Sequence, residues 1–320
     1  MKFNRREFLH TAAGFGIASL LPGCSGNQSG STNETAAAVE TPSAVAIPTR
    51  LIPSTSESLP VVGFGSTKAV RLIPENGPGE IRSVIQTLLE NGGRVIDTSY
   101  REEELDRPFG EILQDPAWKD KLFVSTKINT MGKEAGIAQI EQTERLFNRH
   151  PADLIQVESL RDVDVHLETL REWKDNGRTR YVGITTSSSA DHERMEEYMN
   201  KVPLDFIQVN YSIPESGAAE RVLPLAKEKG LAVLINSPFM NGEWFSLTAG
   251  KELPGWAAEI ECTSWAQIGL KFILANQAIT CVLTETTSPD HLVENLQSSL
   301  GKMPDEELQR RMKSDVLALI

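Results

Sequence analysis

Residues 151–186, PADLIQVESLRDVDVHLETLREWKDNGRTRYVGITT, contain the unit from which the fold can be inferred. Two short stretches rich in Val, Ile and Leu, DLIQVES (153–159) and RYVGITT (180–186), are typical of buried strands. Between them, HLETLREWKDNG (166–177) has the apolar spacing of an amphipathic helix and ends at a glycine after Asn, a usual helix stop. This order predicts parallel strands joined by a helix that covers the sheet.

The same alternation continues along the chain from about residue 51. Six more stretches have the composition of short buried strands: VVGFGS, RVIDTS, LFVSTKI, DFIQVNYS, LAVLINSP and ITCVLTET. Eight strands, each followed by a helix, predict an α/β protein of the (β/α)8 TIM-barrel class, built as a single domain by residues 50–320. A doubly wound open sheet is the alternative, and the absence of a G-x-G-x-x-G fingerprint after the first strand disfavours it.

Two segments fall outside this alternation. RLIPSTSESLP (50–60) precedes the first strand and predicts a hairpin that closes the bottom of the barrel. FMNGEWFSLTAGKELPGWAAEIECTS (239–264) follows the seventh strand and is longer than an ordinary connection between a strand and a helix. Connections of that length are usually functional, so we expect this one to lie over the active face.

The composition argues against one broad class of partner. The 320 residues are 40% hydrophobic and 24% charged, as is ordinary for a soluble globular protein, and the formal net charge is −12. Because no basic stripe is available to displace counterions from phosphates, we do not expect the protein to bind nucleic acid.

The first residues, 1–24, predict a targeting segment rather than part of the fold. Arg5 and Arg6, followed by Phe8, Leu9 and a short apolar run, resemble a twin-arginine export signal. The run is too short to span a bilayer as a mature helix. We therefore expect an exported protein, located in the periplasm or cell envelope, that uses the twin-arginine export machinery.

The apolar run closes at LPGC (21–24), which resembles a lipoprotein processing box with Cys24 as the lipidated residue. A plain export peptide cut nearby is the alternative. Residues 25–49 are rich in Ser, Thr, Ala, Gly and Asn and predict a flexible tether, so a lipid on Cys24 would be the protein's contact with the membrane. Cys262 and Cys281 would remain in the body; an oxidising compartment would let them pair, but we expect two free buried thiols.

Polar residues at the ends of the predicted strands indicate a site, because side chains at the carboxyl ends of barrel strands form the active site. Asp97, Lys127 and Glu158 end the second, third and fourth strands. Asp97 facing Lys127 predicts a buried ion pair that could hold a proton donor in place. The alternative is that these residues only close the top of the barrel. The later strands end at Thr185, Thr186, Gln208, Asn210, Asn236, Ser237 and residues 284–287. No metal site is predicted.

The body resembles the aldo-keto reductases. The resemblance is carried by LPVVGFGS, VIDTS, STKI, DLIQVESL, LREWKDNGRTRYVGITT, IQVNYS, LPGWAAEIECTSWAQIGLKFILANQAITCV and SPDHLVENL, which are spread from about residue 51 to the C-terminus. It implies a (β/α)8 barrel, hydride transfer from a nicotinamide cofactor to a small-molecule carbonyl, and a catalytic set of Asp, Tyr, Lys and His.

Asp97 and Lys127 match the Asp and Lys of that set, but the other two members differ. The family's tyrosine lies five residues after the aspartate, where this chain has Glu102, and Tyr100 lies two residues short of that place. The histidine position is Glu158, a residue also found in a family branch that reduces activated C=C bonds. We expect an altered site in which Tyr100 or Glu102 is the proton donor.

The resemblance also implies cofactor-binding residues. The set consists of Ser66, Thr185, Thr186, Gln208, Ser237, Thr286, Glu294 and Asn295. The loop after the eighth strand, LTETTS, carries Glu285 and Ser288 where the family often has Gly or Lys. A glutamate near the adenosine phosphate would repel it, so NAD is expected in preference to NADP.

Two hypotheses follow. The first is a nicotinamide-dependent oxidoreductase that acts on a carbonyl or an activated C=C bond and carries a tightly bound cofactor through export. The second is a catalytically inactive or cofactor-free barrel that acts as a surface-tethered binding protein. A nicotinamide chromophore in protein purified from the cell envelope would discriminate between them.

Overall fold

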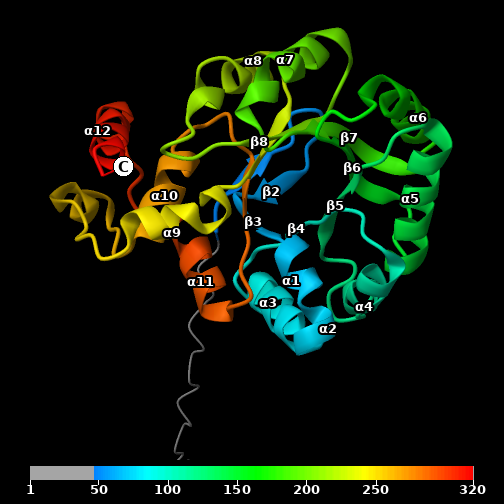
Figure 1. Ribbon diagram of the computed structural model, residues 1–320, viewed down its shortest axis with the longest axis horizontal. Coiled ribbons are helices and arrows are strands. Elements are labelled where there is room, and N and C mark those ends of the chain that lie inside the picture. The colour runs from blue at the N-terminus through cyan, green and yellow to red at the C-terminus, as the bar shows by residue number, and fades with distance from the viewer. Residues whose placement is uncertain (1–46, 320) are drawn as a thin grey trace, which may run out of the picture. The chain divides into compact units, whose positions relative to one another are not determined.

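A closed barrel forms the centre of the molecule in the computed structural model, which describes residues 47–319. Within that range eight parallel strands pair in sequence order, and the last also pairs with the first (Figure 1). The strands are β3 (Val62–Gly65), β4 (Val95–Asp97), β5 (Phe123–Ile128), β6 (Ala152–Glu158), β7 (Thr179–Thr185), β8 (Phe206–Asn210), β9 (Ala232–Asn236) and β10 (Cys281–Thr284). The closure confirms the TIM-barrel prediction and excludes the open sheet.

Helices surround the barrel on its outer face (Figure 1). α6 and α8 end near Gly177 and Gly230, whose φ angles of +72° and +65° lie in the left-handed region that glycine adopts without strain. The α-helices are α1 (Thr67–Arg71), α2 (Ile73–Asn76), α3 (Gly79–Glu90), α4 (Glu103–Leu113), α5 (Lys133–Phe147), α6 (Val163–Asp175), α7 (His192–Lys201), α8 (Val222–Lys229), α9 (Glu243–Thr248), α10 (Trp265–Leu274), α11 (Pro289–Gln297) and α12 (Glu306–Leu317).

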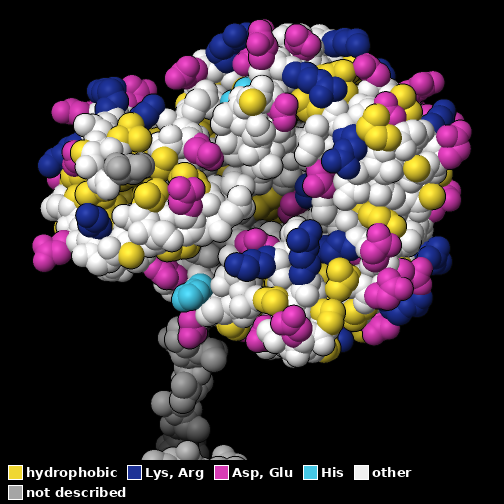
Figure 2. All heavy atoms as spheres, viewed as in Figure 1, with side chains coloured by type: hydrophobic (Ala, Val, Ile, Leu, Met, Phe, Trp, Pro, Cys, Tyr) yellow, Lys and Arg dark blue, Asp and Glu magenta, His cyan; other side chains and the backbone are white. Residues whose placement is uncertain are grey.

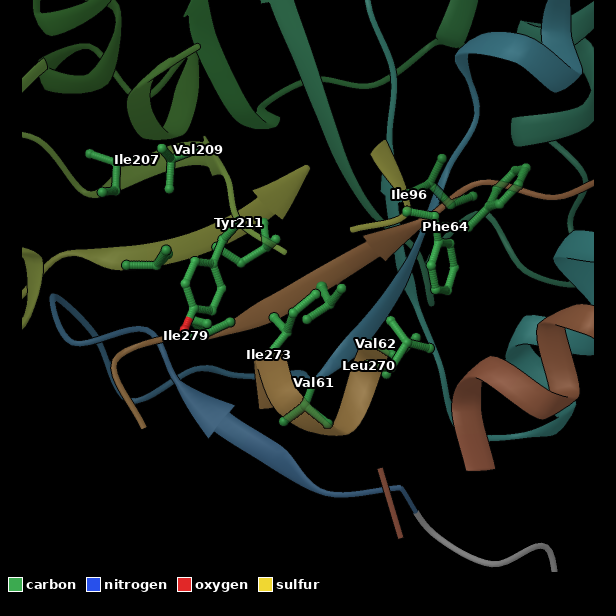
Figure 3. Packing of buried hydrophobic residues seen from close by; sticks show 14 of the residues in the cluster. Val61, Val62, Phe64, Ile96, Ile207, Val209, Tyr211, Leu270, Ile273 and Ile279 are labelled. Carbon is green, nitrogen blue, oxygen red and sulfur yellow. The ribbon is translucent and has the colours of Figure 1, made fainter. Parts of the chain in front are cut away.

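Two apolar layers pack on opposite sides of the sheet, because successive residues of a strand point to opposite faces. The outer layer lies between barrel and helices, and Figure 3 shows part of it, with Val62 and Phe64 of β3 and Leu270 and Ile273 of α10. Tyr211, also in this layer, stacks on Phe272 with ring centroids 5.7 Å apart. The inner layer consists of Ile52, Leu59, Val95, Phe123, Leu154, Tyr181, Phe206, Ala232, Leu234, Cys281 and Leu283.

The predicted hairpin is formed by β1 (Thr49–Leu51) and β2 (Ser58–Pro60). Ile52 and Leu59 belong to the inner layer, so the hairpin plugs the amino-terminal end of the barrel. The guanidinium of Arg50 on β1 donates to the carbonyl oxygens of Leu274, at 2.6 Å, Asn276, at 3.0 Å, and Ile279. Leu274 is the last residue of α10, and Asn276 and Ile279 lie in the loop after it, so Arg50 joins the hairpin to the end of this helix.

The body begins a few residues before the predicted boundary at residue 50. Ile47 lies in the predicted tether 25–49, but its side chain is buried and lies next to Gly92. Apolar contact with the barrel thus orders the last part of that segment. The predicted export signal, the possible lipidation site at Cys24 and the tether up to residue 46 lie outside the described residues.

The long stretch after β9 contains more regular structure than a loop. It folds into α9 and two 3-10 turns, η3 (Met240–Gly242) and η4 (Gly255–Ile260). Trp244 and Trp256 are almost completely buried and fasten the stretch to the body. As expected, part of it lies at the carboxyl end of the barrel, where it borders a cavity described below.

Cys262 and Cys281 are free and buried, which confirms the prediction of unpaired thiols. Burial raises the pKa of the Cys262 thiol to about 11 and raises that of Cys281 further. Between residues 47 and 319, no helix combines the length and the apolar character that crossing a membrane requires.

Candidate active site

Asp97 and Lys127 form a buried ion pair inside the carboxyl end of the barrel. The alternation that turns Val95 and Phe123 inward also turns Asp97, two residues later, and Lys127, four residues later. The Nζ atom of Lys127 lies 2.6 Å from Oδ2 of Asp97 and 2.7 Å from the carbonyl oxygen of Thr98. Because an ammonium group has three protons, Lys127 retains one for a ligand.

Glu158 faces the same cavity from the end of β6. The hydroxyl of Ser99 donates a hydrogen bond to its Oε2. The cavity has a volume of about 700 Å³. Its lining brings together Asp97, Tyr100, Lys127, Glu158, Thr185, Thr186, Gln208 and Ser237 from the predicted set, with Thr67, Arg71, Ser99, Arg101, Asn129, Ser159, Ser187 and Asn236.

The backbone is strained on two sides of this cavity. Three of the four residues after Glu158 have positive φ: Ser159 (54°), Leu160 (50°) and Asp162 (46°). After β9, Ser237 (49°), Met240 (49°) and Asn241 (55°) also have positive φ. Such conformations cost on the order of 1 kcal/mol or more each, and they gather at functional sites. Their position therefore favours a site over a plain barrel cap.

Tyr100 and Glu102, the predicted proton donors, are placed differently. Tyr100 lines the cavity, but its hydroxyl lies 3.4 Å from Oε1 of Gln142 on α5. Burial, and next the charge of Glu102, raise the pKa of the Tyr100 phenol. Glu102 is exposed at the N-cap of α4 and does not line the cavity. The turn into α4 thus carries Glu102 away from Asp97 and Lys127.

Arg101 is a cavity residue that the sequence reasoning missed. Only 6% of it is exposed, and its guanidinium forms an ion pair with Asp106 on α4 at 2.9 Å. It also donates to the hydroxyl of Thr98 at 3.0 Å and to the carbonyl oxygen of Ser99 at 2.7 Å. These bonds fix the loop that carries Ser99 and Tyr100. Nothing in the sequence pointed to this ion pair. Arg101 lies in a loop and Asp106 in the first turn of α4, and neither helix nor strand periodicity relates two such positions.

At the predicted nicotinamide site, the side-chain amides of Gln208 and Asn236 each have a polar atom that could bond to a ligand. The hydroxyl of Thr185 donates to Oε1 of Gln208 at 2.7 Å and so orients that amide. Among the described residues, the buried Nε2 of Gln208 and Oδ1 of Asn236 have no hydrogen-bond partner. Asn236 is held by a 3.0 Å bond from its Nδ2 to the carbonyl oxygen of Thr186. One free donor and one free acceptor in the same cavity fit a carboxamide such as that of nicotinamide.

A second cavity of about 1240 Å³ adjoins the first and shares Thr67, Asp97, Asn236 and Ser237 with it. Phe239 and Phe245, with ring centroids 4.9 Å apart, form one wall. Glu285 also lines it, and its carboxylate accepts a hydrogen bond from the backbone N–H of Lys68 in α1. Because four residues line both cavities, the two spaces lie next to each other, as the binding of an extended ligand would require.

Four predicted cofactor residues line neither cavity. Ser66 is buried and donates to the carbonyl oxygen of Asp97 at 3.0 Å, and Thr286 accepts from the backbone N–H of Ser288 at 3.0 Å. On α11, Glu294 accepts a bond from the hydroxyl of Ser264, and Asn295 is buried. No group of His, Cys, Asp and Glu among the described residues is arranged to hold a metal ion.

Comparison with known proteins agrees with the fold. The model of the "Aldo/keto reductase family" matches residues 62–315. The "NADH-specific methylglyoxal reductase" of Escherichia coli is 25% identical over 171 residues, which cover 45% of this chain and 51% of that protein. An "Aldo-keto reductase" of Gibberella moniliformis is 22% identical over 302 residues, covering 80% and 90%. The chain thus spans about half the length of the first relative and most of the second.

Solved structures share the fold. The aldo-keto reductase AKR11C1 from Bacillus halodurans, in its holo form, superposes with a TM-score of 0.66 at 21% identity, covering 84% of this chain and 96% of that one. An aldo-keto reductase from Klebsiella pneumoniae in complex with NADPH gives 0.67 at 15% identity, covering 82% and 92%.

Proposed function

The chain belongs to the aldo/keto reductase family, and on this premise we propose that it is a nicotinamide-dependent oxidoreductase acting on a small carbonyl compound or on a C=C bond activated by a carbonyl. One observation carries the proposal: the Asp97–Lys127 ion pair, Glu158 and the unpaired amide groups of Gln208 and Asn236 line one cavity. A scaffold that had lost its chemistry would have no need to keep these groups buried and polar, since unpaired buried polar atoms destabilise the fold.

Lys127 is the electrophilic group in this proposal. Its remaining N–H points to the substrate oxygen and stabilises the negative charge that develops there during reduction. Asp97 holds the ammonium group, as does the carbonyl oxygen of Thr98, so Lys127 does not have to reorganise when charge develops. The same interaction would polarise a carbonyl conjugated to a C=C bond.

Glu158 is the better candidate for the proton donor. Glu102 lies outside the cavity, and the raised pKa of Tyr100 makes its phenol a poorer acid. Glu158 lines the cavity and is oriented by the hydroxyl of Ser99. When protonated, its carboxyl group would donate to the substrate oxygen, which gives an alcohol from a carbonyl compound, or from an enone an enol that then tautomerises. Because the hydroxyl of Tyr100 is directed to Gln142, and because Glu158 stands where the C=C-reducing branch of the family also has glutamate, we expect simple aldehydes to be poorer substrates than enones.

Gln208, Asn236 and Thr185 would hold the nicotinamide carboxamide, and Ser237, which lines both cavities, could contact another part of the cofactor. The cofactor supplies or accepts the hydride when it is bound. Glu285 favours NAD, because its carboxylate lies at the second cavity and would repel an additional phosphate there.

The decisive experiment uses full-length protein purified from the cell envelope of an expressing bacterium. We expect the absorption and fluorescence of a bound nicotinamide, or quenching of tryptophan fluorescence when NADH is added. Turnover is then measured with a reactive aldehyde and with an enone, using Lys127→Met as the control. Protein that binds neither NADH nor NADPH would refute the proposal.

A second candidate function is a binding protein without catalysis. The exposure of Glu102 and the orientation of the Tyr100 hydroxyl toward Gln142 favour it, because they leave no activated phenol beside Lys127. In that case carbonyl compounds would bind in the cavity with no nicotinamide present, and Lys127→Met would weaken binding without any activity to lose.

We also propose that the protein is exported folded by the twin-arginine machinery and is held in the cell envelope by a lipid on Cys24. Arg5, Arg6 and the sequence LPGC (21–24) support this. Fractionation of cells that express the full chain tests it: Arg5→Lys combined with Arg6→Lys should leave the protein in the cytoplasm, and Cys24→Ala should release it from membranes. An unchanged distribution of both variants would contradict the proposal.

A further inference from the structure

Basic side chains gather at one side of the first cavity. Arg71, at the end of α1, Arg101 and Lys127 all line it, and Lys68 of α1 lines the adjoining cavity. Figure 2 shows Lys and Arg side chains grouped at the edge of the central hollow, in the region where Figure 1 places α1. A protein with a net charge of −12 thus places positive charge at the entrance to its candidate active site.

Of the three cationic side chains that line the first cavity, two form ion pairs with described residues and one does not. Lys127 is neutralised by Asp97, and Arg101 by Asp106. Glu158 receives the hydroxyl of Ser99. Arg71 is exposed, and within residues 47–319 it forms no ion pair and no side-chain hydrogen bond that would hold it in place. Burial raises the pKa of Glu285 in the adjoining cavity and the charge of Arg71 acts against that rise, but the hydrogen-bond donors of Arg71 are available to a ligand.

Arg101 lines the same cavity and is fixed by its bonds to Thr98, Ser99 and Asp106. Burial lowers the pKa of its guanidinium, and the charge of Arg71 acts in the same direction. Its Nε atom is buried and has no partner among the described residues. Asp106 already pairs with Arg101, so the guanidinium that an anion could bind is that of Arg71.

We propose that the substrate carries an anionic group, a carboxylate or a phosphate, which binds Arg71 while Lys127 receives the carbonyl oxygen. Arg101 acts as a positioning residue, because it holds the loop of Ser99 and Tyr100. This substrate class rests on the proposed function, but the binding of the anion does not depend on turnover. A neutral carbonyl compound of the same size would lack the contact with Arg71.

The experiment compares 4-carboxybenzaldehyde with its neutral methyl ester. Calorimetry measures the binding of each to the full chain in the presence of oxidised NAD, so that no reduction can occur. We expect the acid to bind about fivefold tighter, the effect of one partly exposed ion pair. Arg71→Gln should abolish the difference, Arg71→Lys should keep part of it, and Arg310→Gln on α12, which removes the same charge away from both cavities, should leave it unchanged.

Three further measurements complete the test. Added salt should reduce the advantage of the acid but not the affinity of the ester. 4-Formylphenyl phosphate, used in parallel, shows whether the site prefers phosphate or carboxylate. Titration of NADH into Arg71→Gln shows whether the arginine serves the cofactor instead. Equal affinity of the wild type for acid and ester would overturn the proposal, as would an Arg71→Gln variant that loses NADH binding but still binds the acid as tightly as wild type. If the wild type prefers the acid but shows no turnover, only the proposed function is overturned.

Discussion

The hydroxyl of Ser99 donates a hydrogen bond to the carboxylate of Glu158 across the top of the barrel. The bond joins the loop after β4 to the end of β6. It gives Glu158 a fixed orientation in the cavity that also contains Lys127. A proton donor on β6 can thus replace one on the loop after β4, which is where the family's tyrosine would lie.

Glu158→Gln is expected to lower kcat/KM by about 100-fold or more, the usual cost of losing a general acid. Tyr100→Phe should change it by less than about threefold, far below the contribution of a general acid. Steady-state rates with an enone and a reactive aldehyde provide the measurement, and Glu102→Gln is the matched control because that side chain is exposed. Brisk wild-type aldehyde reduction that disappears in Tyr100→Phe would show that the tyrosine is the donor after all.

Lys127→Met should abolish turnover and destabilise the fold. Removal of the ammonium leaves Asp97 charged and buried, which costs about 3–5 kcal/mol. Chemical denaturation of the single variant and of Lys127→Met with Asp97→Asn separates the two effects. The double variant should recover most of the stability and none of the activity; if it stayed as unstable as the single variant, the ion pair would not be the source of the loss.

Glu285→Lys should move the cofactor preference toward NADPH. At about 4 Å and an effective dielectric of about 20, two unit charges interact by roughly 4 kcal/mol, and solvent exposure reduces this. A change of about tenfold in the NADPH to NADH affinity ratio is expected, equivalent to about 1.4 kcal/mol. Fluorescence titrations of wild type, Glu285→Lys and the control Glu306→Lys on α12 measure it, and equal ratios in all three would dismiss the role of Glu285.

Tyr211→Phe should make the fold less sensitive to alkali. Burial raises the pKa of Tyr211 to about 12, above its ordinary value of 10.0. The unfolded chain therefore releases this proton first, so the contribution of Tyr211 to stability is complete below pH 10 and is lost as the pH rises to 12. At about 1.4 kcal/mol per pH unit, wild type should lose roughly 2–3 kcal/mol more than Tyr211→Phe over this window. Denaturation curves at several alkaline pH values test this, and parallel losses would contradict it.

Arg50→Met should destabilise the barrel although Arg50 lies far along the chain from α10. Hydrogen bonds from a charged donor contribute about 1.5–3 kcal/mol, and the carbonyl oxygens at the end of α10 would lose theirs. Leu51→Ala is the neighbouring control, because Leu51 is 60% exposed and should change the free energy of unfolding by less than about 0.5 kcal/mol. Similar effects of the two changes would mean that the guanidinium is not what holds the hairpin.

The sequence was informative wherever a regular period governs the structure. The alternation of strands and helices predicted the barrel, and the position of Asp97 and Lys127 at the ends of the second and third predicted strands predicted that they meet. Loop residues follow no such period. The turn into α4 removes Glu102 from the cavity and brings in Arg101, and neither outcome can be read from spacing, since it depends on the pairing of Arg101 with Asp106 in three dimensions.

The β1–β2 hairpin closes one end of the barrel and leaves the opposite end to the cavity. The described chain starts with Ile47 beside Gly92 and enters the hairpin that plugs the amino-terminal end of the barrel, whereas Lys127 and Glu158 lie at the carboxyl end. Small molecules would therefore enter and leave the active site by the same end of the barrel, so that product has to depart before the next substrate can bind.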